Sequence, residues 1–457
     1  MLNFEKRQGP AFAEGEAPEY PRAEVPTWYR DAKLGIFIHW GLYSVPAWAT
    51  VGDGTQVPVE DAYAHHKYAE WYGNTVRIAG SPTHTRHEEK YGVGHSYEDF
   101  ADVWNLGDFD TSEFVRSLGE TGAKYVVLTT KHHDGFCLWD TPTTGFNSAA
   151  RGPRRDIVQE VHGATRALGL KFGTYFSGAL DWHASNFPAI ESDVDLFRFR
   201  RNDPRFAQFS AAQLEELVER FEPDVLWNDI EWPDAGKGSD SYGLAALLTR
   251  YFDRVPEGVI NDRWGIPYHG FLTREYTNVD DILETPWEST RGLGLSFGYN
   301  SAESADLTLT GVELIHQLID VVSKNGNLLI NVGPRADGTI PELQRRTLAE
   351  LGDWMGLNAR AIHGTRPWLR AGDAGERGTA PVAYTQGEGT LYLHALQPEQ
   401  AAVRLPEEIR PGSRAAWLTK DGDASGLVAV GDSGLVEIPH SLRSAPAAVL
   451  EVVRESR

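Results

Sequence analysis

Cysteine is almost absent from this sequence. Its 457 residues include a single cysteine, Cys137, and two methionines. One thiol cannot form an intramolecular disulfide, and it cannot build a cysteine-based zinc cluster. We therefore expect Cys137 to be a small buried apolar residue.

Long apolar runs and an excess of positive charge are also lacking. No stretch approaches the roughly 18 consecutive apolar residues that indicate a membrane span, and the N-terminal 20 residues lack the apolar core of a signal peptide. Acidic residues outnumber basic ones by 65 to 43, and the net charge of -22 would repel a phosphate backbone. These absences predict a soluble cytoplasmic protein without a nucleic-acid or membrane partner. They leave open whether it forms a homo-oligomer.

Short apolar runs alternate with amphipathic stretches between about residues 33 and 332. This alternation predicts repeated βα units on a parallel sheet, and apolar runs of this kind are typical of strands buried on both faces. We expect a (β/α)8-like barrel, incomplete or distorted because seven strand candidates stand out instead of eight; a doubly wound open sheet is the alternative. The strand candidates are residues 34–40, 124–133, 170–177, 224–229, 258–262, 293–299 and 327–333. The helix candidates between them are residues 111–121, 156–168, 210–221, 242–252 and 311–323.

The pattern changes from helical to strand-like after a last helical segment at 341–362. Short β-prone runs then alternate with Gly, Asp and Pro turns, which predicts a small antiparallel β-sandwich. These runs are residues 382–386, 390–396, 401–405, 415–419, 426–430 and 447–453. We therefore predict two domains, a barrel over 1–365 and a β-sandwich over 366–457.

Polar and aromatic side chains recur where the predicted strands end. In a (β/α)8 barrel, the C-terminal ends of the strands form the active-site face. The side chains in question are His39, Trp40, His132, His133, Tyr175, Ser177, Trp227, Asp229, Asp262, Arg263, Phe297 and Tyr299. The chain also has 14 tryptophans and 17 tyrosines, a weak indication of sugar binding because pyranose C–H faces stack on aromatic rings.

Hydrolysis of a glycosidic bond requires two carboxyl groups. Asp229 is a candidate nucleophile because it ends the buried run VLWND beside Trp227. Asp residues also end strands simply to cap the following turn, and spacing alone favours neither interpretation. For the acid/base, Glu275, Glu284 and Glu288 all lie between two strand candidates, and composition does not choose among them.

Several other polar groups have two interpretations each. His39, His132 and His133 are able to bind sugar hydroxyls or to bond the backbone. As metal ligands they are disfavoured, since adjacent strand residues such as His132 and His133 point to opposite faces. Glu70, beside Trp71 in a loop-like stretch, is either a ligand-binding carboxylate or a solvent-exposed one. Arg263 either donates to a hydroxyl or a catalytic carboxylate, or forms a structural salt bridge.

Five exact strings occur together in this order: KLGIFIHWGLYSVPAW, AEWYGN, KYVVLTTKHHDGFCLWDT, LWNDIEWP and SFGYN. With NGNLLINVGPRADGTI at 325–340, they make the sequence resemble glycoside hydrolase family 29, the α-L-fucosidases, from about Trp28 to Trp368. The resemblance implies a (β/α)-barrel followed by a β-sandwich, net retention of anomeric configuration, and neither a metal nor a cofactor.

The resemblance also assigns residues. The aspartate of the family's Trp-x-Asp motif is Asp229, the implied nucleophile. Glu275 is the implied acid/base because residues 273–276 match a Thr-x-Glu-Tyr context; Glu288, in PWEST, is the reserve. Phe297 is expected to face the apolar side of fucose and its C6 methyl group. The implied fucose-binding residues are His39, Glu70, Trp71, His132, His133, Tyr175, Trp227, Arg263 and Phe297.

These assignments predict a retaining, exo-acting α-L-fucosidase that removes terminal L-fucose from a fucosylated glycan or glycoside by double displacement. The SFGYN string is similar to that of the family's broad-specificity subgroup. Two rival hypotheses stay open: a noncatalytic sugar-binding protein, and a metal hydrolase that uses His39, His132 and His133. Galactosidase side activity is a further alternative, because L-fucose resembles a 6-deoxy-galactose of the opposite series.

Overall fold

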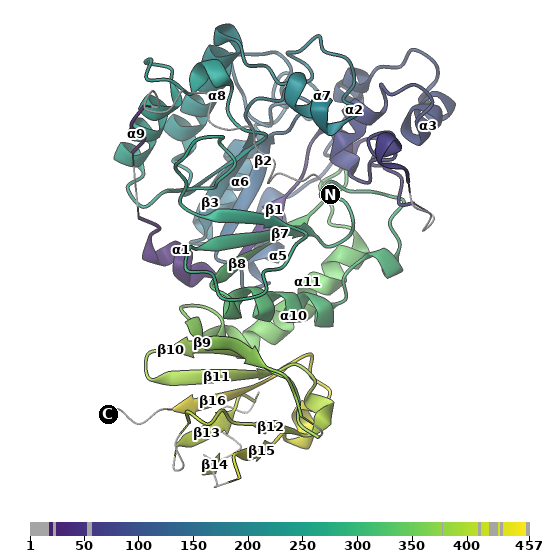
Figure 1. Cartoon of the computed structure of the whole chain (residues 1–457). Coiled ribbons are helices and arrows are strands. Elements are labelled where there is room, and N and C mark those ends of the chain that lie inside the picture. Colours follow the sequence, from purple (N-terminus) through teal and green to yellow (C-terminus); the bar gives the residue numbers. More distant parts are fainter. Residues whose placement is uncertain are drawn as a thin grey trace.

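The computed structural model describes residues 18–21, 24–52, 57–376, 378–409, 413–419, 428–429 and 433–453. Eight parallel strands form the sheet of the larger part, in the order β5-β4-β3-β2-β1-β8-β7-β6 (Figure 1). Strands β1 to β4 span Leu34–Ile38, Tyr125–Lys131, Lys171–Ser177 and Val225–Asp229. Strands β5 to β8 span Val259–Ile260, Leu272–Glu275, Trp287–Gly292 and Gly326–Val332.

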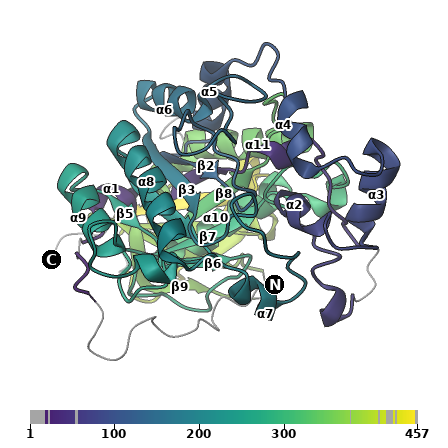
Figure 2. The ribbon, with the colours of Figure 1, turned by 90° about the horizontal axis from the view of Figure 1, so that it is seen from above.

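Amphipathic helices cover the outside of the strands, and seen from above α5, α6, α8 and α9 surround one side of them (Figure 2). Helix α5, for example, buries Phe114, Val115 and Leu118, and Asp110 caps its first turn by accepting from two backbone N–H groups. The longer helices are α5 (Thr111–Gly119), α6 (Ile157–Ala167), α8 (Pro204–Phe221), α9 (Leu244–Arg254), α10 (Gly311–Ser323) and α11 (Glu342–Asn358). The shorter ones are α1 (Thr27–Ala32), α2 (Tyr72–Thr75), α3 (Pro82–Tyr91), α4 (Phe100–Val103) and α7 (Asp193–Arg198).

The predicted barrel-like fold is confirmed, and the doubly wound alternative is wrong because the strands follow one another in cyclic sequence order. Two strands escaped prediction. β6 is only four residues long, and β7 has the polar sequence WESTRG. The strand expected at 293–299 is wrong, since this stretch is an irregular loop directly after β7. The barrel is also distorted as expected, because the sheet order places β5 and β6 at its two ends.

Hydrogen bonds cross this gap between β5 and β6. At the end of β5, the backbone N–H of Gly270 donates to Ile260 O (2.9 Å). Above that point Asp262 Oδ1 accepts from the backbone N–H of Thr273 (3.1 Å) and from its hydroxyl (2.7 Å). A carboxylate therefore takes the place that a strand carbonyl would hold in a closed barrel.

The C-terminal part is antiparallel, as predicted, and lies below α10 and α11 in Figure 1. One sheet has the order β14-β13-β16-β11-β10-β9, and β12 pairs with β15 in a second. The larger sheet contains β9 (Arg366–Asp373), β10 (Val382–Gly387), β11 (Thr390–Ala395), β13 (Arg414–Trp417), β14 (Val428–Ala429) and β16 (Ala448–Val453). The smaller one contains β12 (Ala402–Arg404) and β15 (Leu435–Glu437). Strands β9 and β15 were not predicted, and residues 426, 427 and 430 of one predicted run lie outside the described residues.

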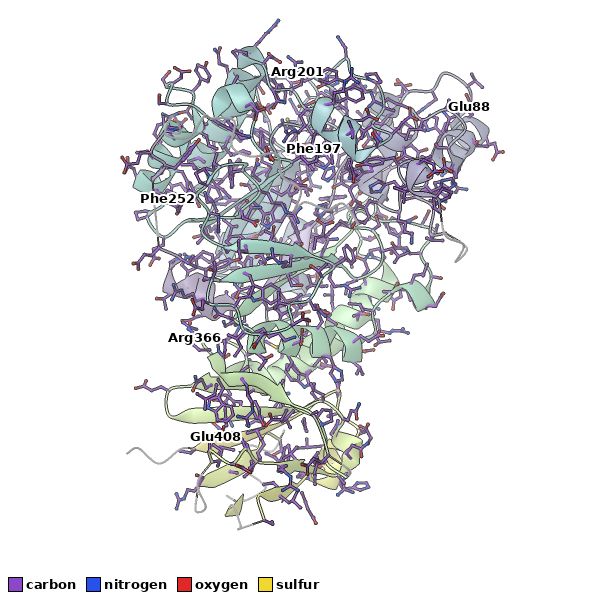
Figure 3. The ribbon with its side chains drawn as sticks, viewed as in Figure 1. Glu88, Phe197, Arg201, Phe252, Arg366 and Glu408 are labelled. Carbon is purple, nitrogen blue, oxygen red and sulfur yellow. The ribbon has the colours of Figure 1, made fainter. Side chains whose placement is uncertain are left out.

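The C-terminal sheets contact the barrel through specific side chains. Trp354 Nε1 of α11 donates to Ala447 O (2.9 Å). Arg366, at the junction of the two parts (Figure 3), forms an ion pair with Asp31 of α1 (2.8 Å). β9 begins directly after residue 365, and the division into two domains at that point stays a prediction.

Cys137 is a free, fully buried cysteine, as predicted. Residues 1–17, on which the interpretation of the N-terminus rests, lie outside the described residues. In the part of the chain that is described, no helix is long and apolar enough to cross a bilayer.

Candidate active site

One pocket at the C-terminal ends of the strands brings the predicted site residues together. It encloses about 410 Å³ of empty space. Its lining includes the predicted residues His39, Glu70, Trp71, His132, His133, Tyr175, Trp227, Asp229, Arg263, Glu275 and Phe297. Phe37, Tyr68, Ile230 and Thr290 complete it. Glu284 and Glu288 are absent from this lining.

Asp229 ends β4 with its carboxylate held on both oxygens. Tyr175 Oη donates to Oδ2 (2.9 Å), and Arg263 Nη1 donates to Oδ1 (3.1 Å). Burial favours the neutral acid, but the Arg263 charge, His133 and these hydrogen bonds outweigh it and lower the pKa of Asp229. The carboxylate is therefore ionised near pH 7 and fixed in orientation.

Glu275 ends β6 on the other side of the gap in the sheet. Its Oε2 accepts from Arg263 Nη2 (3.0 Å), and its Oε1 accepts from Tyr68 Oη (3.0 Å). One guanidinium group therefore binds Asp229 with one terminal nitrogen and Glu275 with the other. The planar fork of arginine suits this bridging role, and it holds the two carboxylates at opposite sides of a single group.

Buried histidines supply neutral hydrogen-bond acceptors. Burial lowers the pKa of His39 to about 3 and that of His133 to about 4, so both rings are neutral near pH 7. His39 Nδ1 lies 2.6 Å from Asn331 Oδ1, which only accepts, so the proton is on Nδ1. His133 Nδ1 lies 2.7 Å from Ser177 Oγ, whose own proton goes to Leu180 O. In each ring Nε2 is left as an acceptor.

Glu70 and Trp71 lie in a 3-10 turn at Ala69–Trp71 and are buried, not solvent-exposed. Glu70 Oε2 accepts from the backbone N–H of Gly298 (2.7 Å) and from Ser296 Oγ (3.1 Å). Burial nevertheless raises the pKa of Glu70 to about 7. The Trp71 ring lies parallel to that of His66, with ring centroids 4.8 Å apart.

Aromatic rings form the apolar wall of the pocket. Phe297 lies in the loop after β7, with its ring centroid 4.9 Å from His39, 5.5 Å from Tyr68 and 6.4 Å from Phe37. A side chain without polar atoms at this place suits a ligand group that carries no hydroxyl.

Sequence reasoning missed four residues of the lining. Phe37 lies inside an apolar strand, where nothing distinguishes a pocket residue from a core residue. Thr290 belongs to the unpredicted strand β7, and Ile230 directly follows Asp229. Tyr68 donates a hydrogen bond to Glu275, and its position two residues before Glu70 was the available signal.

Glu288, the reserve acid/base, lies beneath the pocket inside the barrel. It is fully buried and accepts from Tyr29 Oη (2.9 Å), Tyr125 Oη (2.6 Å) and Trp227 Nε1 (2.9 Å). All three donors occupy the carboxyl group, and Trp227, which lines the pocket, lies between it and that space. The structure therefore favours Glu275 over Glu288 as the group that meets a ligand.

Known proteins share this combination of fold and site. A family model described as Alpha-L-fucosidase matches residues 6–360. The chain belongs to the α-L-fucosidase family. It is therefore a member of a family of glycoside hydrolases, as its motifs predicted.

Relatives of this fucosidase-family chain come from distant organisms. The α-L-fucosidase of Dictyostelium discoideum is 33% identical over 353 residues, covering 75% of this chain and 72% of the relative. The tissue α-L-fucosidase of Homo sapiens is 32% identical over 416 residues, covering 86% and 81%. A Thermotoga maritima α-L-fucosynthase solved with α-L-Fuc-(1-2)-β-L-Fuc-N3 is 40% identical, covers 94% of this chain and 97% of its own, and has a TM-score of 0.86. The T. maritima α-fucosidase in complex with fucose has the same identity and coverage, with a TM-score of 0.84.

The described residues of this family member contain no ligand set that would support the metal-hydrolase hypothesis. Among them, no group of three or more His, Cys, Asp or Glu side chains is arranged to hold a metal ion. His39 and His133 each use Nδ1 for a protein partner.

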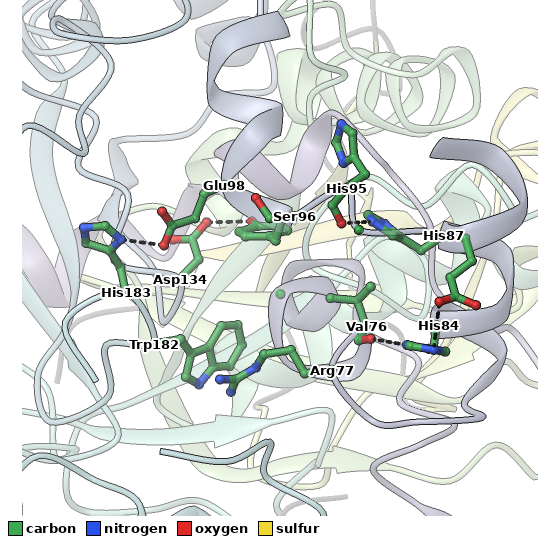
Figure 4. A pocket seen from close by; sticks show the side chains of 14 residues that line it. Val76, Arg77, His84, His87, His95, Ser96, Glu98, Asp134, Trp182 and His183 are labelled. Atoms are coloured by element: carbon green, nitrogen blue, oxygen red, sulfur yellow. Dashed lines mark hydrogen bonds and ion pairs between the residues drawn. The ribbon is translucent and has the colours of Figure 1, made fainter. Parts of the chain in front are cut away.

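A larger depression beside the candidate active-site pocket has about 1040 Å³ of space, part of it open to solvent (Figure 4). The Trp182 ring stands between the two spaces, with its centroid 5.4 Å from Trp71 and 5.8 Å from His133. Tyr97 Oη donates to Asp134 Oδ2 (2.7 Å), and His183 pairs with Glu98 (2.7 Å). These polar groups therefore have protein partners without a ligand.

Glu288→Gln should change how stability depends on pH. Burial raises the pKa of Glu288 to about 7, although its three donors oppose the shift. Between about pH 4.5 and pH 7 the folded state keeps a proton that the unfolded chain releases, so this group makes the free energy of unfolding fall as pH rises. Glutamine has no such proton. We expect the variant to gain on the order of 2 kcal/mol relative to wild type between pH 5 and pH 8, measured by urea unfolding.

A matched control for this measurement is Glu342→Gln. Glu342 is exposed on α11, and its ion-pair partner among the described residues is Arg345. Its substitution should leave the difference from wild type unchanged between the two pH values. If Glu288→Gln behaves in the same way, the folded-state pKa of Glu288 is not raised.

Proposed function

We propose that this chain is a retaining, exo-acting α-L-fucosidase that releases terminal L-fucose from fucosylated glycans or glycosides. The bridge formed by Arg263 is the observation that carries this proposal. It places an ionised carboxylate, Asp229, and a second carboxyl group, Glu275, in the same pocket on either side of one guanidinium group. Glycoside hydrolysis uses a pair of carboxyl groups, and retention requires the two to lie close together.

The proposed reaction has two displacements. In the first, Asp229 attacks the anomeric carbon, the bond to the leaving oxygen breaks, and Glu275 gives that oxygen a proton. The sugar is then attached to Asp229 through a β-linked ester. In the second, Glu275 takes a proton from water, the water oxygen attacks the anomeric carbon, and the ester bond breaks to release α-L-fucose.

The remaining pocket residues would bind the sugar. The neutral Nε2 atoms of His39 and His133 accept hydrogen bonds from hydroxyl groups. Phe297 faces the C6 methyl group, and Trp71 flanks the ring. The floor is closed by Phe37 and Trp227, whose ring centroids lie 5.2 Å apart, and a closed floor suits a terminal sugar and exo-action.

The first test is hydrolysis of 4-nitrophenyl α-L-fucoside, with the anomer that forms first identified by NMR. We expect α-L-fucose, and activity unchanged by EDTA. Release of β-L-fucose would contradict retention, and fucose binding without turnover would favour the noncatalytic sugar-binding protein. Loss of activity in EDTA, restored by a metal, would favour the metal hydrolase. An aryl β-D-galactoside measured in parallel ranks the galactosidase side activity.

Arg263→Gln should move the acid limb of the pH profile. Because Arg263 helps to hold the pKa of Asp229 below its usual range, removing the charge lets burial raise that pKa. The carboxylate then becomes protonated at a higher pH, so the acid limb of kcat/KM shifts upward, and kcat/KM falls by about 10²-fold at its optimum. Arg263→Lys keeps the charge and should lose rate without the shift. An unmoved acid limb in Arg263→Gln would show that Arg263 does not control the ionisation of Asp229.

A further inference from the structure

The turn that follows Asp229 has an unusual backbone. Ile230 and Glu231 both have positive φ, 54° and 61°. Residues other than glycine seldom adopt this left-handed conformation, and a β-branched side chain such as that of Ile230 disfavours it most. Such residues persist only where the surrounding structure holds them, and they concentrate at active sites.

Backbone hydrogen bonds fix this turn to the loops on both sides. The N–H of Gly178, after β3, donates to Asp229 O (3.0 Å), and the N–H of Ala179 donates to Glu231 O (3.0 Å). The N–H of Glu231 donates to Arg263 O (3.1 Å). Glu231 therefore anchors the main chain of Arg263, whose side chain bridges Asp229 and Glu275.

The Glu231 carboxylate is the side-chain anchor of the turn. It is 8% exposed, and its Oε2 accepts from Lys237 Nζ (3.0 Å) and lies 2.9 Å from Arg200 Nη1. Both cationic side chains are only 3% exposed. A Cβ atom at Gly265 would lie 2.5 Å from Oε2, so glycine is needed there for the carboxylate to fit. Segments after β3, β4 and β5 thus converge on one carboxylate.

We propose that Glu231 is a positioning residue, whose buried ion pairs hold the strained turn and thereby set the place of Asp229 relative to Arg263. This inference rests on the proposed function of Asp229. Glu231 does not line the pocket, so it would act only through its neighbours. A purely structural role would instead give a loss of stability without a change in turnover.

The chain offers a matched control at the other end of the same strand. Asp224 immediately precedes β4, is 5% exposed, and pairs with Arg166 and Lys171. Asp224→Asn therefore removes a buried carboxylate with two cationic partners, as Glu231→Gln does, but far from the pocket. Glu231→Gln leaves Arg200, which is 3% exposed, without its carboxylate, whereas Lys237 keeps Asp234 (2.7 Å). Asp224→Asn leaves Arg166 and Lys171, each 34% exposed, without theirs. Both variants should therefore have a lower Tm.

The test compares kcat and KM for 4-nitrophenyl α-L-fucoside, together with Tm, in wild type and these two variants. Glu231→Gln should lower kcat by about 10- to 100-fold with KM within about twofold, because a small displacement of a reacting group is costly. Asp224→Asn should keep kcat within about twofold. In an Asp229→Gly background, where no carboxylate remains to be placed, Glu231→Gln should change the azide-rescued rate by less than about threefold.

Four outcomes overturn the proposal. An unchanged kcat in Glu231→Gln, with a Tm lowered as in Asp224→Asn, shows a structural role alone. An equal loss of kcat in both variants shows a general effect of destabilisation. An inactive wild type overturns this proposal and the proposed function together. If Glu231→Gln does not fold, Arg200→Gln removes one cation and keeps the carboxylate, and an unchanged kcat there also contradicts the proposal.

Discussion

Replacing Asp229 by glycine should lower kcat for 4-nitrophenyl α-L-fucoside by a factor on the order of 10⁴. In the proposed mechanism the variant loses the group that bonds to the anomeric carbon, whereas Tyr175 and Arg263, the partners of that group, are unchanged. Azide fits the vacated volume and attacks from the same face. It should therefore restore turnover and give β-L-fucosyl azide, which NMR identifies.

Two results would count against Asp229 as the nucleophile. A variant that keeps more than about a tenth of the wild-type rate would show that the carboxylate is structural, since loss of a nucleophile costs far more. If activity is lost and no fucosyl azide forms, circular dichroism and fucose binding show whether the variant is folded. A variant that matches the wild type in both measurements and still gives no azide product would contradict the assignment.

Glu275→Ala should separate good leaving groups from poor ones. An aryl oxide leaves without full protonation, so the loss with 4-nitrophenyl α-L-fucoside should be modest. A fucosylated oligosaccharide needs the proton, and its rate should fall by about 10³-fold or more. Azide then attacks the sugar bound to Asp229 from the opposite face. The product should be α-L-fucosyl azide, the opposite anomer to that from Asp229→Gly.

Glu288→Ala is the matched comparison for Glu275→Ala. Glu288 contacts the pocket only through Trp227, so its removal should slow the aryl and oligosaccharide substrates by similar factors, without an azide product. If the selective loss and the azide product instead appear in Glu288→Ala and not in Glu275→Ala, the two assignments must be exchanged.

The apolar strands could be predicted because their own residues indicate that they are buried. Strands β1, β2 and β8 are buried along their full length and consist largely of apolar side chains. β7 could not be predicted in this way. Its Glu288, Ser289 and Thr290 are buried although polar, and the groups that make this tolerable for Glu288, such as Tyr125, are distant in sequence.

The site shows the same division. Ends of apolar strands indicated His39, His133 and Asp229 without any partner being known. The sequence could not decide between the two interpretations of Arg263, because the contacts that decide are formed only in the folded protein. There, one guanidinium group binds two carboxyl groups that are 46 residues apart in the sequence. Spacing left Asp229 undecided between nucleophile and turn cap, and its side-chain partners Tyr175 and Arg263 now favour the former.

The gap between β5 and β6 has a consequence for how this kind of enzyme diverges. Asp229 belongs to a paired strand and cannot shift along the chain without breaking the ladder with β3. Glu275 stands on the far side of the gap, where Asp262 and Arg263 reach across with side chains. Glu275 is itself paired, with Thr290 of β7, so each carboxyl group is fixed in the ladder on its own side of the gap. An insertion in the connection between β5 and β6 therefore breaks no strand ladder, yet it can change the distance between the two carboxyl groups.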